Sequence, residues 1–203
     1  MKNILSYTEF ASMPVIMVIH MYDPVSDTLT FNLGHMANVI GRRHNDEDLL
    51  DTFRQNRDKI KAIVIGGSRL SPLKEEKDHT LPEEILDSGK PILGICYGYE
   101  LFMKSAGAKL KRMKIAEKMV VQARLKKVPL FNGLSQDTAV YMNHDIMVTE
   151  VPTGYEKIAE TDRTPYAGLQ NVEKKFWGVQ FHPEKTWIDE IIFKNFLDII
   201  KDL

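Results

Sequence analysis

The apolar residues of this chain fall into short runs that alternate with segments of helical periodicity. Three runs rich in β-branched residues, PVIMVIHM (14–21), KAIVIGG (61–67) and PILGIC (91–96), end in or near turn-forming residues. Apolar runs of this length are typical of strands that are covered on both faces. We therefore predict three parallel strands in the core of an α/β protein.

Helical patterns separate and follow these runs. Residues 81–90 (LPEEILDSGK) place Pro82 near a helix start and Gly89 at its end, which predicts a crossover helix. A second helix is predicted directly after Cys96, with Gly107 as its stop. Residues 188–203 have apolar positions at helical intervals and predict a terminal amphipathic helix.

The middle of the chain predicts strands instead of helices. Between residues 115 and 182 we expect five short strands separated by turns, at 120–125, 138–144, 155–161, 166–172 and 176–182. Residues 22–57 are too polar for a firm assignment.

Composition narrows the function classes. The 203 residues, 43% of them hydrophobic, suit one large α/β domain, and we expect a single domain over 1–203. With 27 basic and 28 acidic side chains, the formal charge of −1 favours neither nucleic acid nor an anionic membrane as a partner. One cysteine, no signal-peptide pattern and no apolar stretch long enough to span a bilayer predict a cytoplasmic location.

The single cysteine lies in a distinctive setting. Gly94 and Gly98 flank Cys96 at two residues on either side, between a predicted strand and a predicted helix. This is the pattern of a nucleophile elbow, a strained turn whose close neighbours must lack a Cβ atom. The amides at the start of the helix would also favour the thiolate. A lone cysteine is often a buried structural residue, but the paired glycines favour a nucleophile.

A nucleophilic thiol needs a base and a group that orients the base. GVQFHPEKT puts His182 and Glu184 two residues apart after an apolar strand. In an extended chain their side chains would point the same way, so the carboxylate could hold the imidazole.

These motifs together resemble the class I, or triad-type, glutamine amidotransferases. The family's GICxGxQ elbow is similar to GICYGYE (94–100), its GVQFHPE to residues 178–184, and its strand-ending glycine pair to IGG (65–67). Within the family, residues 141–170 resemble the glutaminase part of GMP synthases. The resemblance implies a flavodoxin-like mixed, mostly parallel sheet with helices on both faces.

The resemblance also implies roles for individual residues. Cys96 would attack the side-chain amide of glutamine, His182 would move protons, and Glu184 would orient His182. The backbone N–H groups of Gly67 and Tyr97 would form the oxyanion hole.

In the same family a motif that matches Asn143, His144, Asp145 and Ile146 holds the amino and carboxylate groups of glutamine through backbone groups. We expect neither a cofactor nor a metal.

This sequence departs from the family pattern at three places. Glu100 stands where the elbow motif normally ends in Gln, and Asp145 stands where Gly is usual. The N-terminal third also lacks the usual opening motif. An ionised Glu100 near the thiolate would raise the pKa of the thiol unless Glu100 is protonated or paired.

Three functions therefore stay open. The first is a glutaminase subunit that supplies ammonia to a separate ATP-dependent synthetase, one that makes GMP. The sequence favours it because no pyrophosphatase loop of the S-G-G-x-D-S type and no second domain are found. The second is a hydrolase of another γ-glutamyl compound, and the third is a catalytically weak regulatory or interaction protein.

Overall fold

The computed structural model describes residues 11–21, 28–68, 71–73 and 81–203. Its strands form one nine-stranded mixed sheet: β1 (Val15–His20), β2 (Asn38–Arg43), β3 (Ile60–Ile65), β4 (Ile92–Ile95), β5 (Lys109–Leu125), β6 (Asp137–Glu150), β7 (Glu156–Glu160), β8 (Gly168–Asn171) and β9 (Phe176–Val179). Its α-helices are α2 (Thr28–Gly34), α3 (Leu49–Asn56), α4 (Glu83–Leu86), α5 (Tyr97–Ser105) and α6 (Asp189–Lys201).

The sheet combines a parallel half with an antiparallel half. The strand order is β2-β1-β3-β4-β9-β8-β7-β5-β6, and the first five strands are mutually parallel. Counted along the chain, these five follow the 2-1-3-4-5 order of flavodoxin-like folds. The predicted α/β class is therefore confirmed. In such sheets, ligands bind beyond the carboxyl ends of the parallel strands, and Cys96 directly follows β4.

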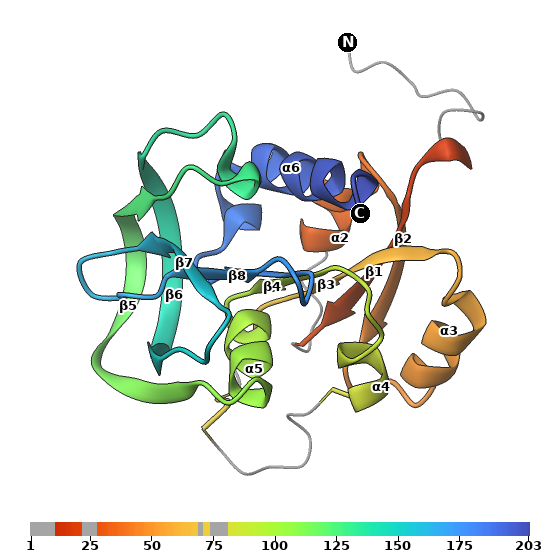
Figure 1. The fold of residues 1–203 in the computed structure, drawn as a ribbon, viewed down its shortest axis with the longest axis horizontal. Helices are drawn as coiled ribbons and strands as arrows, with labels where there is room; N and C mark the ends of the chain where they lie inside the picture. Colours follow the sequence, from red (N-terminus) through yellow and green to blue (C-terminus); the bar gives the residue numbers. More distant parts are fainter. Residues whose placement is uncertain (1–10, 22–27, 69–70, 74–80) are drawn as a thin grey trace.

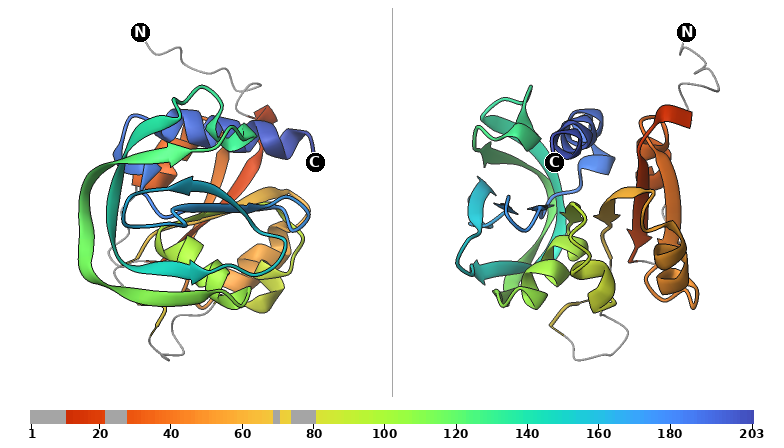
Figure 2. Two further views of the ribbon diagram at one scale, coloured as in Figure 1. Left: turned by 60° about the vertical axis from the view of Figure 1, so that its left-hand side comes forward. Right: turned by 45° about the vertical axis from the view of Figure 1, so that its right-hand side comes forward.

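The helices cover both faces of the parallel half. Helices α2 and α6 pack on one face, while α3, α4 and α5 lie on the other (Figure 1). Figure 2 shows the same two layers from other sides, with the long β5–β6 hairpin curving around the antiparallel end. None of the helices in the described ranges is long and apolar enough to cross a membrane.

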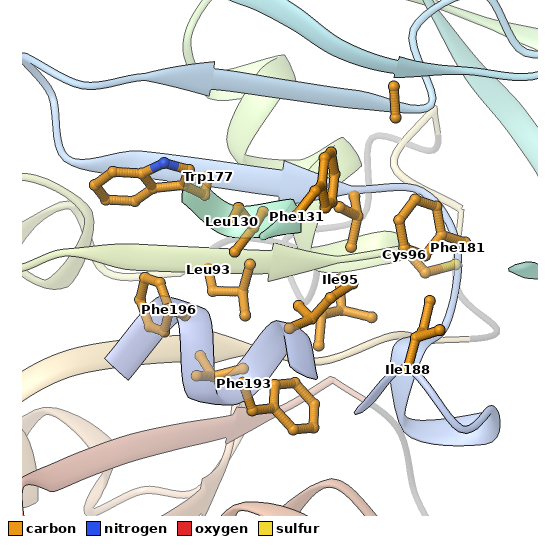
Figure 3. Close-up of a cluster of buried hydrophobic side chains, with 14 of the residues drawn as sticks. Leu93, Ile95, Cys96, Leu130, Phe131, Trp177, Phe181, Ile188, Phe193 and Phe196 are labelled. Carbon is orange, nitrogen blue, oxygen red and sulfur yellow. The ribbon is translucent and has the colours of Figure 1, made fainter. Parts of the chain in front are cut away.

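The core on the α6 face explains why the terminal helix is amphipathic. Phe193 and Phe196 of α6 are fully buried against Leu93 and Ile95 of β4 and against Trp177 of β9 (Figure 3). Fully burying an aromatic or aliphatic side chain of this size contributes about 1.5 to 3 kcal/mol. The predicted helix over 188–203 is confirmed. It covers one face of β4, the strand that directly precedes Cys96.

Several predicted elements differ from the observed ones. The short strands expected at 120–125 and 138–144 are parts of β5 and β6, which have 17 and 14 residues. The helix expected over 81–90 is a single turn, Glu83–Leu86. It ends early because Gly89 is left-handed at φ 73° and Pro91 disfavours a helical residue before it.

The polar region 22–57 contains α2, β2 and α3. Residues 22–27 lie outside the described part of the chain. The expectation of a single domain over 1–203 stays a prediction.

Candidate active site

Cys96 is held on the tight strand-to-helix turn that the glycine spacing predicts. Its backbone is left-handed, with φ 50° and ψ −107°, and it is the N-cap residue of α5. A Cβ atom on Gly98 would lie 2.3 Å from the carbonyl oxygen of Ile65, and one on Gly94 would lie 2.8 Å from the backbone nitrogen of Tyr99. Both contacts are shorter than real Cβ atoms allow. The two glycines are therefore needed for β3, β4 and α5 to meet at this turn.

This close packing makes a direct prediction about stability. Replacing Gly98 by Ala should destabilise the fold by about 1 to 3 kcal/mol, the usual cost of overpacking, because the clash is with backbone and not with a flexible side chain. Chemical denaturation measures the change. The matched control is Gly34→Ala, because nothing lies within 4 Å of a Cβ atom there. Equal stability of the Gly98→Ala protein and the wild type would show that the turn is not as tight as described.

His182 and Glu184 meet as the sequence predicts, but by a different local structure. The Nδ1 atom of His182 and the Oε1 atom of Glu184 are 2.6 Å apart. The chain between them is not extended, because Pro183–Lys185 forms a 3₁₀ turn with His182 as its N-cap. The carboxylate accepts from Nδ1–H, which leaves Nε2 as the atom that can exchange a proton.

The imidazole of His182 lies beside the cysteine. A Cβ atom on Gly67 would lie 2.8 Å from Cε1 of His182 and 3.5 Å from Cβ of Cys96, so Gly67 is adjacent to both side chains. Nε2 of His182 is buried and has no hydrogen-bond partner in the described part of the chain. Burial lowers the pKa of His182, but the Cys96 side chain and Glu184 together outweigh it and raise the pKa to about 10.

The sulfur has two further polar neighbours. Sγ of Cys96 lies 3.8 Å from the backbone oxygen of Asn143 and 3.9 Å from Nε2 of Gln180. Gln180 was not predicted from the sequence. Its position two residues before His182 in the strand expected over 176–182 was the available signal, since residues i and i+2 of a strand share a face.

Glu100 is buried near Cys96 and is hydrogen-bonded to Gln180, whose side-chain amide also contacts the sulfur. Its side chain accepts a 2.7 Å hydrogen bond from Nε2 of Gln180, and the residue is only 4% exposed. Burial, with a smaller contribution from Asp145, raises the pKa of Glu100 to about 8, although the Gln180 bond opposes the shift. At neutral pH this side chain is therefore mostly a neutral carboxylic acid. A protonated Glu100 does not oppose a thiolate, so the first of the two conditions is met at neutral pH.

A cavity of about 490 Å³ lies beside Cys96. Eight residues line it: Ser68, Cys96, Glu100, Ala116, Lys118, Asn143, His144 and Asp145. This volume is within the range of small-molecule sites. A second cavity of about 200 Å³ lies on the His182 side and includes Gly66 and Gly67 in its lining. The site therefore has room for a small polar substrate on one side of the sulfur.

The predicted substrate-binding residues do not all line this cavity. Glu100, Asn143 and Asp145 line it, while Ile146 is buried and does not. The carbonyl of Ile146 instead accepts a 2.6 Å hydrogen bond from Nδ1 of His144. Tyr97 begins α5 directly after Cys96, so its backbone N–H belongs to the first turn of that helix.

Two residues of β5 that the sequence analysis did not single out, Arg112 and Glu117, make polar contacts with β6. Arg112 of β5 forms an ion pair with Asp145 and donates to Oγ of Ser71 at 3.2 Å. Glu117 is buried and bonds to Nε2 of His144 at 3.2 Å and to the hydroxyl of Thr164 at 2.8 Å.

The register of β5 against β6 shifts between Arg112 and Glu117, so this stretch of β5 bulges beside the cavity.

Comparison with known proteins agrees with this geometry. The model of the glutamine amidotransferase class-I family matches residues 17–199. The chain therefore belongs to the class I glutamine amidotransferases.

Its similarity to curated relatives points to one branch of that family. It is 33% identical over 192 residues to the glutamine-hydrolysing GMP synthase of Staphylococcus carnosus, and the match covers 93% of this chain and 36% of the relative. It is 35% identical over 175 residues to that of Clostridium acetobutylicum, or 81% of this chain and 34% of the relative. The chain thus spans about a third of the length of the GMP synthases that it matches.

Solved structures show the same fold. A crystal structure assigned to a GMP synthase subunit from Thermoplasma acidophilum superposes with a TM-score of 0.82 at 20% identity, covering 94% of this chain and 95% of that one. A glutamine amidotransferase from Thermotoga maritima superposes with a TM-score of 0.67 at 19% identity, covering 94% and 91%. At these identities the likeness describes the fold alone.

Proposed function

We propose that this protein hydrolyses the side-chain amide of glutamine through a thioester on Cys96 and supplies the ammonia to an ATP-dependent synthetase that makes GMP. The observation that carries the proposal is the arrangement of His182, paired with Glu184, beside a cysteine on a strained elbow at the mouth of a cavity. The GMP synthase relatives support the choice of synthetase.

The reaction follows from the positions of the three side chains. The Cys96 thiolate attacks the side-chain carbonyl carbon of glutamine and forms a tetrahedral oxyanion. His182 donates its Nε2 proton to the nitrogen, the C–N bond breaks and ammonia leaves. His182 then accepts a proton from water, which attacks the thioester to give glutamate and the free thiol. Glu184 keeps the proton on Nδ1, so that Nε2 does the transfer.

The charge that develops on oxygen needs fixed donors. We propose the backbone N–H groups of Gly67 and Tyr97, because Gly67 lies against both Cys96 and His182 and Tyr97 belongs to the first turn of α5. Donors fixed before the reaction are worth about 10² to 10³ in rate for each one removed from such a hole. The positive end of α5 adds to the same effect.

Glu100 gives the proposal a pH dependence. Below its pKa of about 8 the carboxylic acid carries a proton and can donate a hydrogen bond, as a Gln amide would. Above that pH it becomes an anion beside the reacting sulfur, which opposes both the thiolate and the oxyanion. Activity on glutamine should therefore fall as Glu100 ionises.

The substitution Glu100→Gln should remove this loss. We expect kcat/KM to change by less than about twofold at pH 7 and to increase by roughly tenfold at pH 9.5, a factor equivalent to about 1.4 kcal/mol of transition-state stabilisation. Steady-state glutaminase kinetics of both forms from pH 6 to 10 measure the ratio. A ratio that does not vary with pH would mean that Glu100 does not titrate in this range or does not face the substrate.

A second candidate function is hydrolysis of another γ-glutamyl compound. The motive is the pair of acids, Glu100 and Asp145, that line the cavity at positions where the family usually has Gln and Gly. Ammonia release from glutamine, measured for the chain alone and with a GMP-forming synthetase, tests the two against each other. Release that the synthetase increases supports the first function. A lack of release from glutamine, with turnover of γ-glutamyl amides, would favour the second.

A further inference from the structure

A row of lysines lies at the edge of the sheet opposite the cysteine. The register pairs Ile63 of β3 with Ile92 of β4, so Lys61 lies level with Lys90, two residues earlier on each chain. Lys175 immediately precedes β9, the next strand of the sheet. Neighbouring strands are about 4.8 Å apart. Three positive side chains thus begin from adjacent positions at the amino ends of three parallel strands.

These lysines border a large open cavity. Its volume is about 690 Å³, and five lysines line it: Lys59, Lys61, Lys90, Lys175 and Lys201. No acidic side chain is found among the described residues of its lining. The rest of the lining includes apolar residues, among them Val15, Pro91 and Ile200. The lining therefore combines five lysines with apolar residues.

Most of these lysines form no ion pair with a described residue, although the charge of Asp58 favours the protonated form of Lys90. Lys201 pairs with Asp198, but no ion pair with a described residue is formed by Lys59, Lys61, Lys90 or Lys175. Like charges side by side on neighbouring strands are destabilising. The chain has 28 acidic residues against 27 basic ones, so composition does not force this segregation. Burial, followed by the charge of Lys61, lowers the pKa of Lys90.

The turn between β8 and β9 fixes the backbone of Lys175. Lys175 is left-handed, with φ 52°, and its N–H donates a 3.1 Å hydrogen bond to the carbonyl of Val172. A left-handed residue at the end of such a turn is usual in β-hairpins. The turn therefore holds Lys175 at the start of β9, next to Pro91 and Lys90 in the lining of the cavity.

We propose that this cavity, which we call the lysine pocket, binds a phosphorylated small molecule that also has an apolar or aromatic part. Lysines bind phosphate as point charges, and several of them around one anion replace the missing acidic partners. The volume exceeds what a single phosphate would fill and lies within the range of organic ligands. The apolar residues of the lining would contact the remainder of the ligand.

The lysine pocket is separate from the catalytic cavity. Lys90 and Cys96 are at opposite ends of β4, six residues apart, which corresponds to about 20 Å of extended chain. The two sites therefore share a strand but no lining residue. Ligand binding can be measured directly, and the result does not depend on whether the proposed glutaminase activity is found.

The test is a calorimetric titration at low ionic strength in magnesium-free buffer, with ATP as the organic phosphate and inorganic triphosphate as the bare anion. The variant combines Lys61→Gln and Lys90→Gln. The matched control combines Lys111→Gln and Lys127→Gln, two exposed lysines elsewhere, so that both proteins lose the same number of positive charges. The Kd for ATP should rise at least about tenfold in the variant and stay within about twofold in the control. Added salt should weaken binding.

Four outcomes would overturn the proposal: no ATP binding at millimolar concentration, equal ATP binding by the variant and the wild type, equal loss in the control, or binding of triphosphate as tight as that of ATP. Binding of an acidic peptide in place of ATP would also overturn it, because the ligand would then be a protein. Misfolding does not confuse the result. Removing two mutually repelling charges should leave the thermal midpoint of the variant equal to or above that of the wild type.

Discussion

Replacing Cys96 by Ser is expected to lower the glutaminase kcat by about 10⁴-fold or more, because the thioester route is lost and a serine hydroxyl is a far weaker nucleophile here. The protein should stay folded, since Ser differs from Cys by a single atom. Steady-state ammonia release measures the loss, and circular dichroism and thermal unfolding check the fold.

Cys96 is 3% exposed and has the strained backbone of an elbow, so a structural role is the alternative that this variant must exclude. If the residue were structural, Cys96→Ser would keep its activity, or would lose activity and stability together. Neither of these results is expected for a nucleophile.

Replacing His182 by Ala should lower kcat by about 10² to 10⁴, the usual contribution of a positioned general acid and base. The imidazole has a pKa of about 10 because the Cys96 side chain and Glu184 outweigh burial, so its proton is present at neutral pH for transfer to the leaving nitrogen. Glu184→Gln should cost less, because Glu184 orients the ring and transfers no proton to the substrate. Kinetics of both variants from pH 6 to 10 give the comparison.

The informative result is which of the two variants, His182→Ala or Glu184→Gln, loses more activity. A Glu184→Gln variant that was folded and yet more damaged than His182→Ala would contradict the assigned roles. The Oε2 atom of Glu184 is buried and has no hydrogen-bond partner in the described chain. Glu184→Gln changes the chemistry of this buried side chain, so some loss of stability in that variant is compatible with the assigned roles. Stability is therefore measured separately from activity.

The parts of the site that are local in sequence could be predicted from the sequence. Gly94 and Gly98 around Cys96 predict the elbow because steric exclusion at a tight turn acts on residues next to it. His182 and Glu184 were predicted to meet for a similar reason, although the turn at Pro183 replaced the expected extended chain. Three of the five parallel strands, β1, β3 and β4, were predicted because burial on both faces requires continuous apolar runs. The strand β2 was not predicted, because it is only partly buried and has polar residues.

The parts that depend on long-range pairing could not be predicted. The lengths of β5 and β6 depend on their pairing with each other, and much of β5 is exposed, so its polar residues gave no strand pattern. The contact of Gln180 with Glu100 joins residues 80 positions apart, so no local pattern predicts it. The lysine pocket gathers charges from several separate segments, which no local pattern reports.

The central claim, that Cys96 forms the thioester, is tested most directly by covalent labelling. A diazo-ketone analogue of glutamine occupies the substrate cavity and alkylates the attacking thiolate. Mass spectrometry of the digested protein should find one equivalent of label, on the peptide that contains Cys96, with glutamine protecting against it and His182→Ala slowing it. Labelling at another residue, or no labelling of folded protein at saturating reagent, would contradict the claim.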